Sequence, residues 1–192
     1  MPTMLLMGCE MKLLMLDLDG TIWEPLSGEK FIQHPHDQRI IEGAAQAIAH
    51  YHAEGYQIVG ISNQGGVIAG YKSFNECFEE QRYTLNLLPQ MAQICFCPDF
   101  EGHECWVVNQ VSPVPMSAAS FGYQGAEFRK PGPGMLKFAM WQHGFSPQDS
   151  FYVGDRSEDA AAADAAGVHF FWAETGSLAG LIYNWLRVLL PG

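Results

Sequence analysis

The sequence predicts an α/β protein built around a mainly parallel sheet with helices on both faces. The first observation is alternation, because short apolar runs typical of buried strands take turns with longer segments of helical apolar spacing. The second is that polar residues follow directly after several of these short runs. The third is size and composition: 192 residues, 48% hydrophobic and 16% charged, are typical of one globular domain.

Each element rests on a local pattern. The predicted strands are short, apolar and bounded by polar or turn residues, and they are 12–18, 56–62, 92–97, 150–155 and 168–173. The predicted helices have apolar residues at helical spacing, and they are 39–55, 73–91, 132–144, 157–167 and 178–190. Gly55 ends the first helix, and Ser73 caps the second. Right-handed crossovers between parallel strands then place helices on both faces.

The chain is expected to form a single domain over residues 1–192. Residues 1–10 are interpreted as a short N-terminal extension, since the segment starting at Met11 would make a natural beginning. Residues 98–128 are rich in Ser, Pro and Ala and are predicted to be an irregular insertion loop.

Charge and cysteine content exclude some classes of function. A net charge of −11 with only 10 Lys and Arg argues against an unspecific grip on nucleic acid, which depends on many basic contacts. No apolar run approaches the length of a membrane span, so no membrane association is expected. Five cysteines, an odd number without an export signal, favour a reducing compartment. We therefore expect a cytoplasmic protein that acts as a monomer.

Polar side chains gather where the predicted strands end. Asp17 and Asp19 stand at the end of the first strand, Ser62 and Asn63 at the end of the second, and Asp155 at the end of the fourth. In parallel sheets the functional site lies at the carboxyl ends of the strands, so these side chains should meet at one edge. The alternative is that each aspartate caps a helix or turns a loop. That alternative explains one aspartate well and the whole set poorly.

Four short segments carry a resemblance to a known family. "DLDGT", "SNQ", "RKPGPGM" and "VGDRSED", in this order and spacing, resemble the four motifs of the haloacid dehalogenase superfamily of phosphohydrolases. The chain is most similar to the class III phosphatases, namely the histidinol-phosphate and heptose-bisphosphate phosphatases and the 3′-phosphatase part of polynucleotide kinase phosphatases. The resemblance implies a Rossmann-like, haloacid dehalogenase-like fold. Only about twenty residues separate Thr21 from the predicted helix at Arg39, which is too short for a large cap domain.

The resemblance implies catalytic roles for two aspartates. Asp17 would be the nucleophile that forms an aspartyl-phosphate, which divides one hard step into two. Asp19 would be the general acid for the leaving oxygen and then the base for the attacking water. The second aspartate of "DLDGT" is present in phosphatases and phosphomutases of this superfamily and absent from dehalogenases, so dehalogenation is not expected.

The same resemblance implies a magnesium site. Mg²⁺ prefers oxygen ligands, and these would be the Asp17 carboxylate, the Asp19 backbone carbonyl and Asp155. Asp159, one helical turn after Asp155, would orient the site rather than bind the ion.

Phosphate binding is expected from Ser62, Asn63, Arg129 and Lys130. Ser62 would hydrogen-bond the transferring phosphoryl group with Asn63 alongside, and Lys130 would neutralise both the phosphate and Asp17. Lys130 precedes a predicted helix that opens with Pro131, a position suited to binding an anion. The alternative for Lys130 is a solvated surface lysine.

A structural zinc site is a further hypothesis. Cys95, Cys97, His103 and Cys105 lie close together in the sequence, and heptose-bisphosphate phosphatases have a zinc loop after the third strand. The match is incomplete, because position 99 is aspartate and the ligand order differs. Zinc needs four such ligands in a tetrahedron. The alternative is buried strand cysteines with a surface histidine.

Two classes of substrate remain open at this point. The chain is expected to be a magnesium-dependent phosphatase acting on a small sugar or histidinol-type phosphate or on the 3′-phosphate of a polynucleotide. The segment "SGEKFIQHPHDQRII" resembles the corresponding loop of polynucleotide 3′-phosphatases, whereas "RKPGPGM" is shared with sugar-phosphate enzymes. The alternative from another class is a non-catalytic binding protein that retains the phosphatase fold.

Overall fold

The computed structural model describes residues 11–173 and confirms the predicted α/β alternation. Within these residues, seven strands form one sheet in the order β7-β6-β5-β4-β1-β8-β9. Their bounds are β7 Met116–Ser117, β6 Trp106–Asn109, β5 Gln93–Cys97, β4 Gln57–Asn63, β1 Leu13–Asp17, β8 Ser150–Gly154 and β9 His169–Trp172. Strands β5, β4, β1, β8 and β9 run parallel, and β6 and β7 extend the sheet in antiparallel fashion. The sheet is therefore mainly parallel, as predicted.

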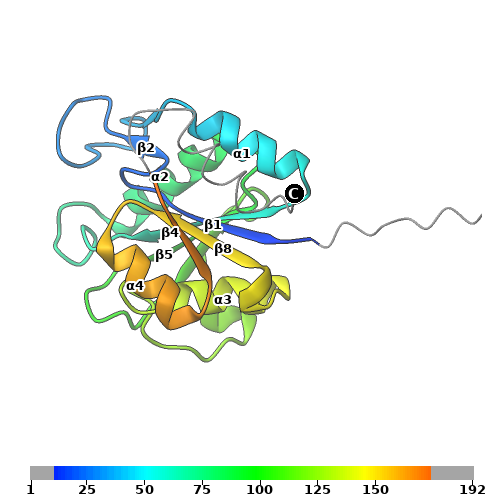
Figure 1. Cartoon of the computed structure of the whole chain (residues 1–192). Helices are drawn as coiled ribbons and strands as arrows, with labels where there is room; N and C mark the ends of the chain where they lie inside the picture. The colour runs from blue at the N-terminus through cyan, green and yellow to red at the C-terminus, as the bar shows by residue number, and fades with distance from the viewer. Residues whose placement is uncertain (1–10, 174–192) are drawn as a thin grey trace, which may run out of the picture.

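Helices cover both faces of this sheet (Figure 1). Helices α1 (Ala44–Ala53) and α2 (Phe74–Leu87) lie on one face, and α3 (Gly134–His143) and α4 (Ser157–Ala166) lie on the other. Short 3-10 turns occupy Ala118–Phe121 and Pro147–Asp149. This layered arrangement is the Rossmann-like fold expected from the alternation.

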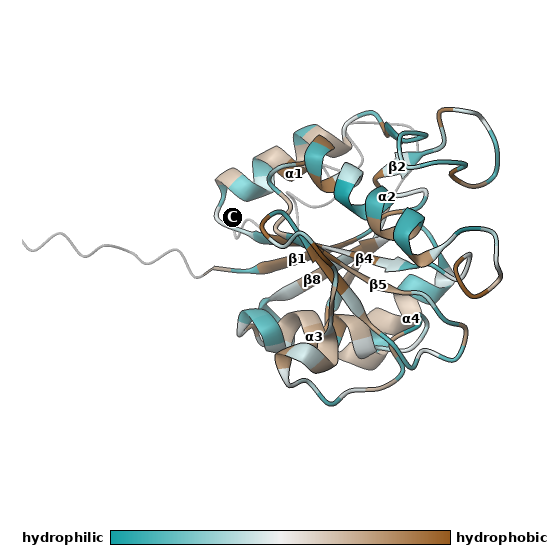
Figure 2. Ribbon diagram, turned by 180° about the vertical axis from the view of Figure 1, so that it is seen from behind, coloured by the Kyte–Doolittle hydropathy of each residue, from teal (hydrophilic) through white to brown (hydrophobic). Residues whose placement is uncertain are grey.

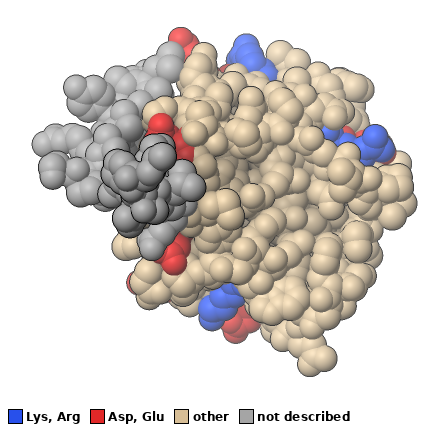
Figure 3. Space-filling view, turned by 90° about the vertical axis from the view of Figure 1, so that its right-hand side faces the viewer, with Lys and Arg blue, Asp and Glu red and all other residues tan. Residues whose placement is uncertain are grey.

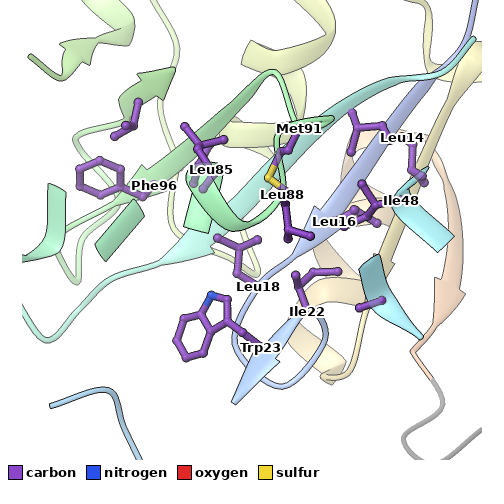
Figure 4. Packing of buried hydrophobic residues seen from close by; sticks show 14 of the residues in the cluster. Leu14, Leu16, Leu18, Ile22, Trp23, Ile48, Leu85, Leu88, Met91 and Phe96 are labelled. Atoms are coloured by element: carbon purple, nitrogen blue, oxygen red, sulfur yellow. The ribbon is translucent and has the colours of Figure 1, made fainter. Parts of the chain in front are cut away.

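The central strand β1 supplies side chains to two separate cores. Leu14 and Leu16 point to the α1 and α2 face, where they pack with Ile48 and Leu85 (Figure 4). Leu13 and Met15, which alternate with Leu14 and Leu16 along the strand, point to the α3 and α4 face. Figure 2 shows the hydrophobic colour of β1 at the centre of the molecule. A strand buried on both faces reads as a continuous apolar run, and each buried Leu contributes about 1.5–3 kcal/mol.

The segment between β1 and α1 holds little regular structure. It contains a two-stranded antiparallel sheet, β2 (Trp23–Glu24) with β3 (Arg39–Ile40). No helix lies between Thr21 and Gly43, all of which the structure describes. The position at which a cap domain would interrupt the chain therefore carries only this short hairpin-like unit and its loops.

Some elements differ from those expected from the sequence. The helix expected over 39–55 begins only at Ala44, because β3 and a turn precede it. The stretch 98–128, expected to be irregular, contains β6, β7 and a 3-10 turn, which continue the sheet beyond β5. The extension 1–10 and the helix expected over 178–190 lie outside the described residues.

Few charged side chains are visible on the side of the molecule where β1 begins (Figure 3). The Lys, Arg, Asp and Glu side chains visible there are scattered. Among the helices of residues 11–173, none combines the length and the apolar character needed to cross a bilayer.

Candidate active site

The alternation of side chains along β1 directs Asp17 toward the α3 and α4 face. Asp17 is the last residue of β1, shares its face with Leu13 and Met15, and is buried. Its Oδ1 accepts a hydrogen bond from Lys130 Nζ at 2.5 Å, and its Oδ2 accepts one from Thr21 Oγ1 at 3.2 Å. The structure thus places the two residues predicted to meet, Asp17 and Lys130, in direct contact.

The backbone of Lys130 is held by Asn63, at the end of β4. The side chain of Asn63 accepts a bond from the Lys130 amide at 3.0 Å and donates one to the Lys130 carbonyl at 2.9 Å. Helix α3 begins at Gly134, so Lys130 precedes it by about one turn rather than standing directly before its first residue, as expected from a helix opening with Pro131. Asn63 was predicted to bind phosphate, but both ends of its amide are used to position Lys130.

Tyr152 and Asp159 complete the surroundings of the lysine. Lys130 Nζ lies 2.7 Å from Asp159 Oδ1 and donates to the Tyr152 hydroxyl at 3.1 Å. The Tyr152 hydroxyl donates to the same oxygen of Asp159 at 2.7 Å, and Asp159 Oδ2 accepts from the Arg156 amide at 3.1 Å. Asp159 therefore helps to hold the Lys130 ammonium beside Asp17.

Asp19 lies beyond the end of β1 and turns toward β4. Its Oδ2 accepts hydrogen bonds from Ser62 Oγ at 3.1 Å and from Gln64 Nε2 at 3.4 Å. Along β4, Ser62 shares its face with Ile58, opposite to the face of Asn63. The two neighbouring polar residues of β4 thus serve two different acids, because consecutive strand residues point to opposite faces.

Burial dominates the electrostatics of this edge. Desolvation raises the pKa of Asp17 to about 7, Lys130 opposes that rise, and the charges of Asp159 and Asp19 add to it. Desolvation also raises the pKa of Asp19, and Lys72 is the main opposing charge. Burial acts to lower the pKa of Lys130, but Asp17, Tyr152 and Asp159 raise it well above its usual range. Lys130 is therefore a permanent positive charge beside Asp17.

The carboxylates of this edge match the donor set of a divalent cation. Among residues 11–173, Asp17, Asp155 and Asp159 form the group of acidic or sulfur ligands whose atoms all lie within 4.8 Å of one another. Asp155 Oδ1 is buried and accepts no hydrogen bond within this part of the chain. Gly20, with φ of 84°, lets the chain pass close to Asp155, because a Cβ there would lie 2.5 Å from Oδ2. Within the described residues, Asp155 Oδ1 forms only a long ion pair, 3.8 Å, with Arg156 Nε, so it is suited to bind a hard cation.

Arg129 stands apart from this cluster. Its guanidinium lies 5.2 Å from the centre of the exposed Phe100 ring and is within 3.5 Å of the Asp99 carbonyl oxygen. It makes no contact with Asp17 or Asp19 among the described hydrogen bonds and ion pairs. The structure thus brings Asp17, Asp19, Ser62, Lys130 and Asp155 to one edge and leaves Arg129 at its border.

The geometry does not support the zinc hypothesis. The described residues offer no cluster of three sulfur or imidazole ligands, and Cys95, Cys97 and Cys105 are buried in the core on the α3 and α4 face. Asp99 organises the loop instead: its carboxylate accepts from the amides of His103 at 3.0 Å and Glu104 at 2.9 Å. Hydrogen bonds from backbone amides to the Asp99 carboxylate therefore stabilise the loop in which a zinc site was expected.

Some residues of this edge were not predicted. Tyr152, Gln64 and Lys72 contact the predicted acids or their partners. Tyr152 pairs with Met15 in the parallel register and so faces the same side as Asp17, but this register is known only from the assembled sheet. Gln64 was part of the "SNQ" segment, but nothing in the sequence around Lys72 singles it out.

The sequence of this chain is similar to a family model and to known phosphatases. The family model described as "Polynucleotide kinase 3 phosphatase" matches residues 12–176. The D-glycero-beta-D-manno-heptose-1,7-bisphosphate 7-phosphatase of Haemophilus ducreyi is 28% identical over 194 residues, covering 94% of this chain and 97% of the relative. The enzyme of the same description from Pasteurella multocida is 30% identical over 165 residues, covering 82% of this chain and 78% of the relative.

A solved structure has the same fold. The D,D-heptose 1,7-bisphosphate phosphatase of B. bronchiseptica, complexed with magnesium and phosphate, superposes with a TM-score of 0.64 at 22% identity, covering 92% of this chain and 99% of that one. Together with the family model and the strand-end aspartates, these similarities confirm the resemblance drawn from the four motifs. The chain belongs to the haloacid dehalogenase superfamily of phosphatases, within the family described as polynucleotide kinase 3 phosphatase.

Proposed function

We propose that this phosphatase hydrolyses phosphomonoesters through an aspartyl-phosphate on Asp17. The observation that carries the proposal is the pairing of the Asp17 carboxylate with the buried Lys130 ammonium at the carboxyl edge of the sheet. A negative nucleophile needs positive charge nearby to approach a phosphate, and Lys130 supplies it without rearrangement because Asn63 and Asp159 hold it in place.

The reaction then proceeds in two steps. An oxygen of Asp17 forms a bond to phosphorus as the ester P–O bond breaks, and Asp19 gives its proton to the departing oxygen. Asp19 next takes a proton from a water molecule that attacks the same phosphorus, and the bond to Asp17 breaks. Ser62 donates a hydrogen bond to Asp19 in this structure, and we assign it to phosphoryl binding once substrate is bound.

Magnesium fits the same edge. The residues that would hold it are Asp17, Asp155 and the backbone carbonyl of Asp19, whereas Asp159 is already engaged with Lys130 and Tyr152. When bound, the ion would neutralise charge on the phosphate during transfer. The B. bronchiseptica relative was solved in complex with magnesium and phosphate, which supports magnesium as the cation.

A small phosphorylated sugar is the substrate class that the comparisons favour. Both curated relatives act on D-glycero-beta-D-manno-heptose 1,7-bisphosphate according to their descriptions, and they align over most of this chain. A 3′-phosphorylated polynucleotide is the second candidate, supported by the description of the family model. The net charge of −11 weighs against this second candidate, because strand binding relies on basic contacts.

The test is phosphate release from heptose 1,7-bisphosphate and from a 3′-phosphorylated oligonucleotide, each with magnesium and with a chelator. We expect magnesium-dependent release with higher kcat/KM on the sugar. Asp17→Asn should reduce release to the level of the enzyme-free control, while Asp164→Asn on the exposed side of α4 should not. Undiminished release by Asp17→Asn would overturn the mechanism, and preference for the oligonucleotide would select the second substrate class.

A further inference from the structure

Behind Asp19 and Ser62 lie three polar side chains, Gln64, Lys72 and Glu80, that the reaction described above does not use. Their contacts start at the ion pair between Lys72 and Glu80, whose side chains are 17% and 3% exposed. They continue through Gln64 to Ser62 and Asp19. Desolvating an ion pair that is buried to this degree is costly, so the pair need not stabilise the folded protein. Its contact with Gln64 indicates another role for the pair.

We propose that Gln64 and Lys72 are positioning residues for Asp19, and that the Lys72–Glu80 pair sets the direction of the hydrogen bonds that end on its carboxylate. The proposal rests on the general acid and base role of Asp19 given above.

The direction follows from the chemistry of the groups. Lys72 Nζ can only donate, so it must face the oxygen of the Gln64 amide, which it reaches at 3.0 Å. The Cys77 thiol faces the same oxygen at 3.7 Å. The amide nitrogen is therefore turned the other way, where Nε2 lies 2.7 Å from Ser62 Oγ and 3.4 Å from Asp19 Oδ2. A flipped amide would bring its oxygen against the Asp19 carboxylate.

The orientation of the Gln64 amide also fixes the orientation of the Ser62 hydroxyl. Because Ser62 Oγ accepts a hydrogen from Gln64, its own hydrogen points to Asp19 Oδ2 at 3.1 Å. Within the described part of the chain, both hydrogen bonds to the Asp19 carboxylate reach Oδ2. Oδ1 is left for the proton that moves to the leaving oxygen. These hydrogen bonds thus decide which oxygen of Asp19 performs the transfer.

Local structure holds Lys72 in this place. Ser73 caps helix α2, accepting from the Glu76 amide at 3.2 Å while the Glu76 side chain accepts from the Ser73 amide at 2.7 Å. This capping box fixes the residue directly before the helix. Gly66 lets the lysine stem pass, because a Cβ at Gly66 would lie 3.2 Å from Lys72 Cε. Glu80, two turns into α2, then fixes the ammonium group.

The test compares substrates that differ in their need for a general acid. A 4-nitrophenolate leaves without protonation, whereas the alkoxide of glycerol phosphate does not. With the magnesium-loaded enzyme, kcat/KM reports the step that releases the leaving group. We expect Lys72→Met to lower kcat/KM on glycerol 2-phosphate by about tenfold or more, and on 4-nitrophenyl phosphate by less than about threefold. Lys137→Met, an exposed lysine of α3, is the matched control and should change neither value.

A second variant separates positioning from folding. Lys72→Met leaves Glu80 buried without its partner, whereas Lys72→Met combined with Glu80→Leu removes both charges, a replacement that is often neutral for stability. The double variant should show the same difference between the two substrates. Equal losses on both substrates, or no loss on either, would overturn the positioning role. A wild-type enzyme that releases phosphate from neither substrate, or an Asp17→Asn variant that keeps activity, would instead contradict the proposed function.

Discussion

At the scale of single residues, the burial of Asp17 lowers the stability of the metal-free protein at neutral pH. Its pKa is raised to about 7, chiefly by desolvation, from an ordinary value of 3.8. Between these two values the folded protein binds more protons than the unfolded chain. The free energy of unfolding of the metal-free protein should therefore fall as pH rises from 4 to 7, and it should stay low above that range.

This gives a prediction for thermal unfolding in the presence of a chelator. The midpoint temperature of the wild type should decline from pH 5 to pH 8, and Asp17→Asn should decline less because it cannot ionise. Magnesium should raise the midpoint more at pH 8 than at pH 5, since binding requires the carboxylates to be deprotonated. The midpoints are measured by calorimetry. If the wild type and Asp17→Asn show the same dependence of the midpoint on pH, Asp17 is not the group that causes the decline.

At the scale of elements, the two faces of strand β4 support different groups of the site. On β4, Asn63 points to the α3 and α4 face and holds Lys130, while Ser62 points to the α1 and α2 face and holds Asp19. The lysine beside the proposed nucleophile and the proposed acid are thus supported from opposite sides of one sheet. A shift of β4 by one residue would exchange these partners, so the parallel register with β1 is part of the site.

The loop after β5 is held together by the Asp99 carboxylate. Asp99 accepts from two backbone amides and so ties together residues 99–104. Asp99→Ala should lower the free energy of unfolding by about 1–3 kcal/mol, because these amides lose a charged partner. Protein purified without added metal should contain no stoichiometric zinc by elemental analysis.

The matched control for this loop is Glu101→Ala, an exposed acid in the same turn. It should leave stability within about 0.5 kcal/mol of the wild type. Stoichiometric zinc, or an Asp99→Ala variant as stable as this control, would contradict the view that a carboxylate organises the loop.

At the scale of the whole molecule, the acidic charge limits how a nucleic acid could be used. With 21 acidic and 10 basic residues, a long strand would find few phosphate contacts beyond its terminal group. If 3′-phosphorylated oligonucleotides are cleaved at all, lengthening them should leave kcat/KM nearly unchanged, and the dependence on salt should be shallow. A steep salt dependence that grows with length would point to an extended binding surface. The monomeric state stays a prediction.

Much of the fold could be predicted from the sequence because the signals are local. The alternation of apolar periods predicted the order of strands and helices, and the strand-end rule predicted that Asp17, Ser62 and Asp155 meet at one edge. The four motifs predicted the superfamily. Segments such as β3 and β6 were missed because a strand of two to four residues has too short a period to recognise, and its pairing depends on a neighbour far along the chain.

What the sequence by itself determined was therefore the class of fold, the edge that carries the site and the acids that stand on it. The pairing of Lys130 with Asp17 was expected from the family resemblance, but only the tertiary structure decided which side chains of β4 support these two groups and Asp19. Asn63 serves Lys130, 67 residues away, and Ser62 serves Asp19, 43 residues away. Such partnerships depend on strand register and on the face to which each side chain points, and these arise only when the sheet assembles.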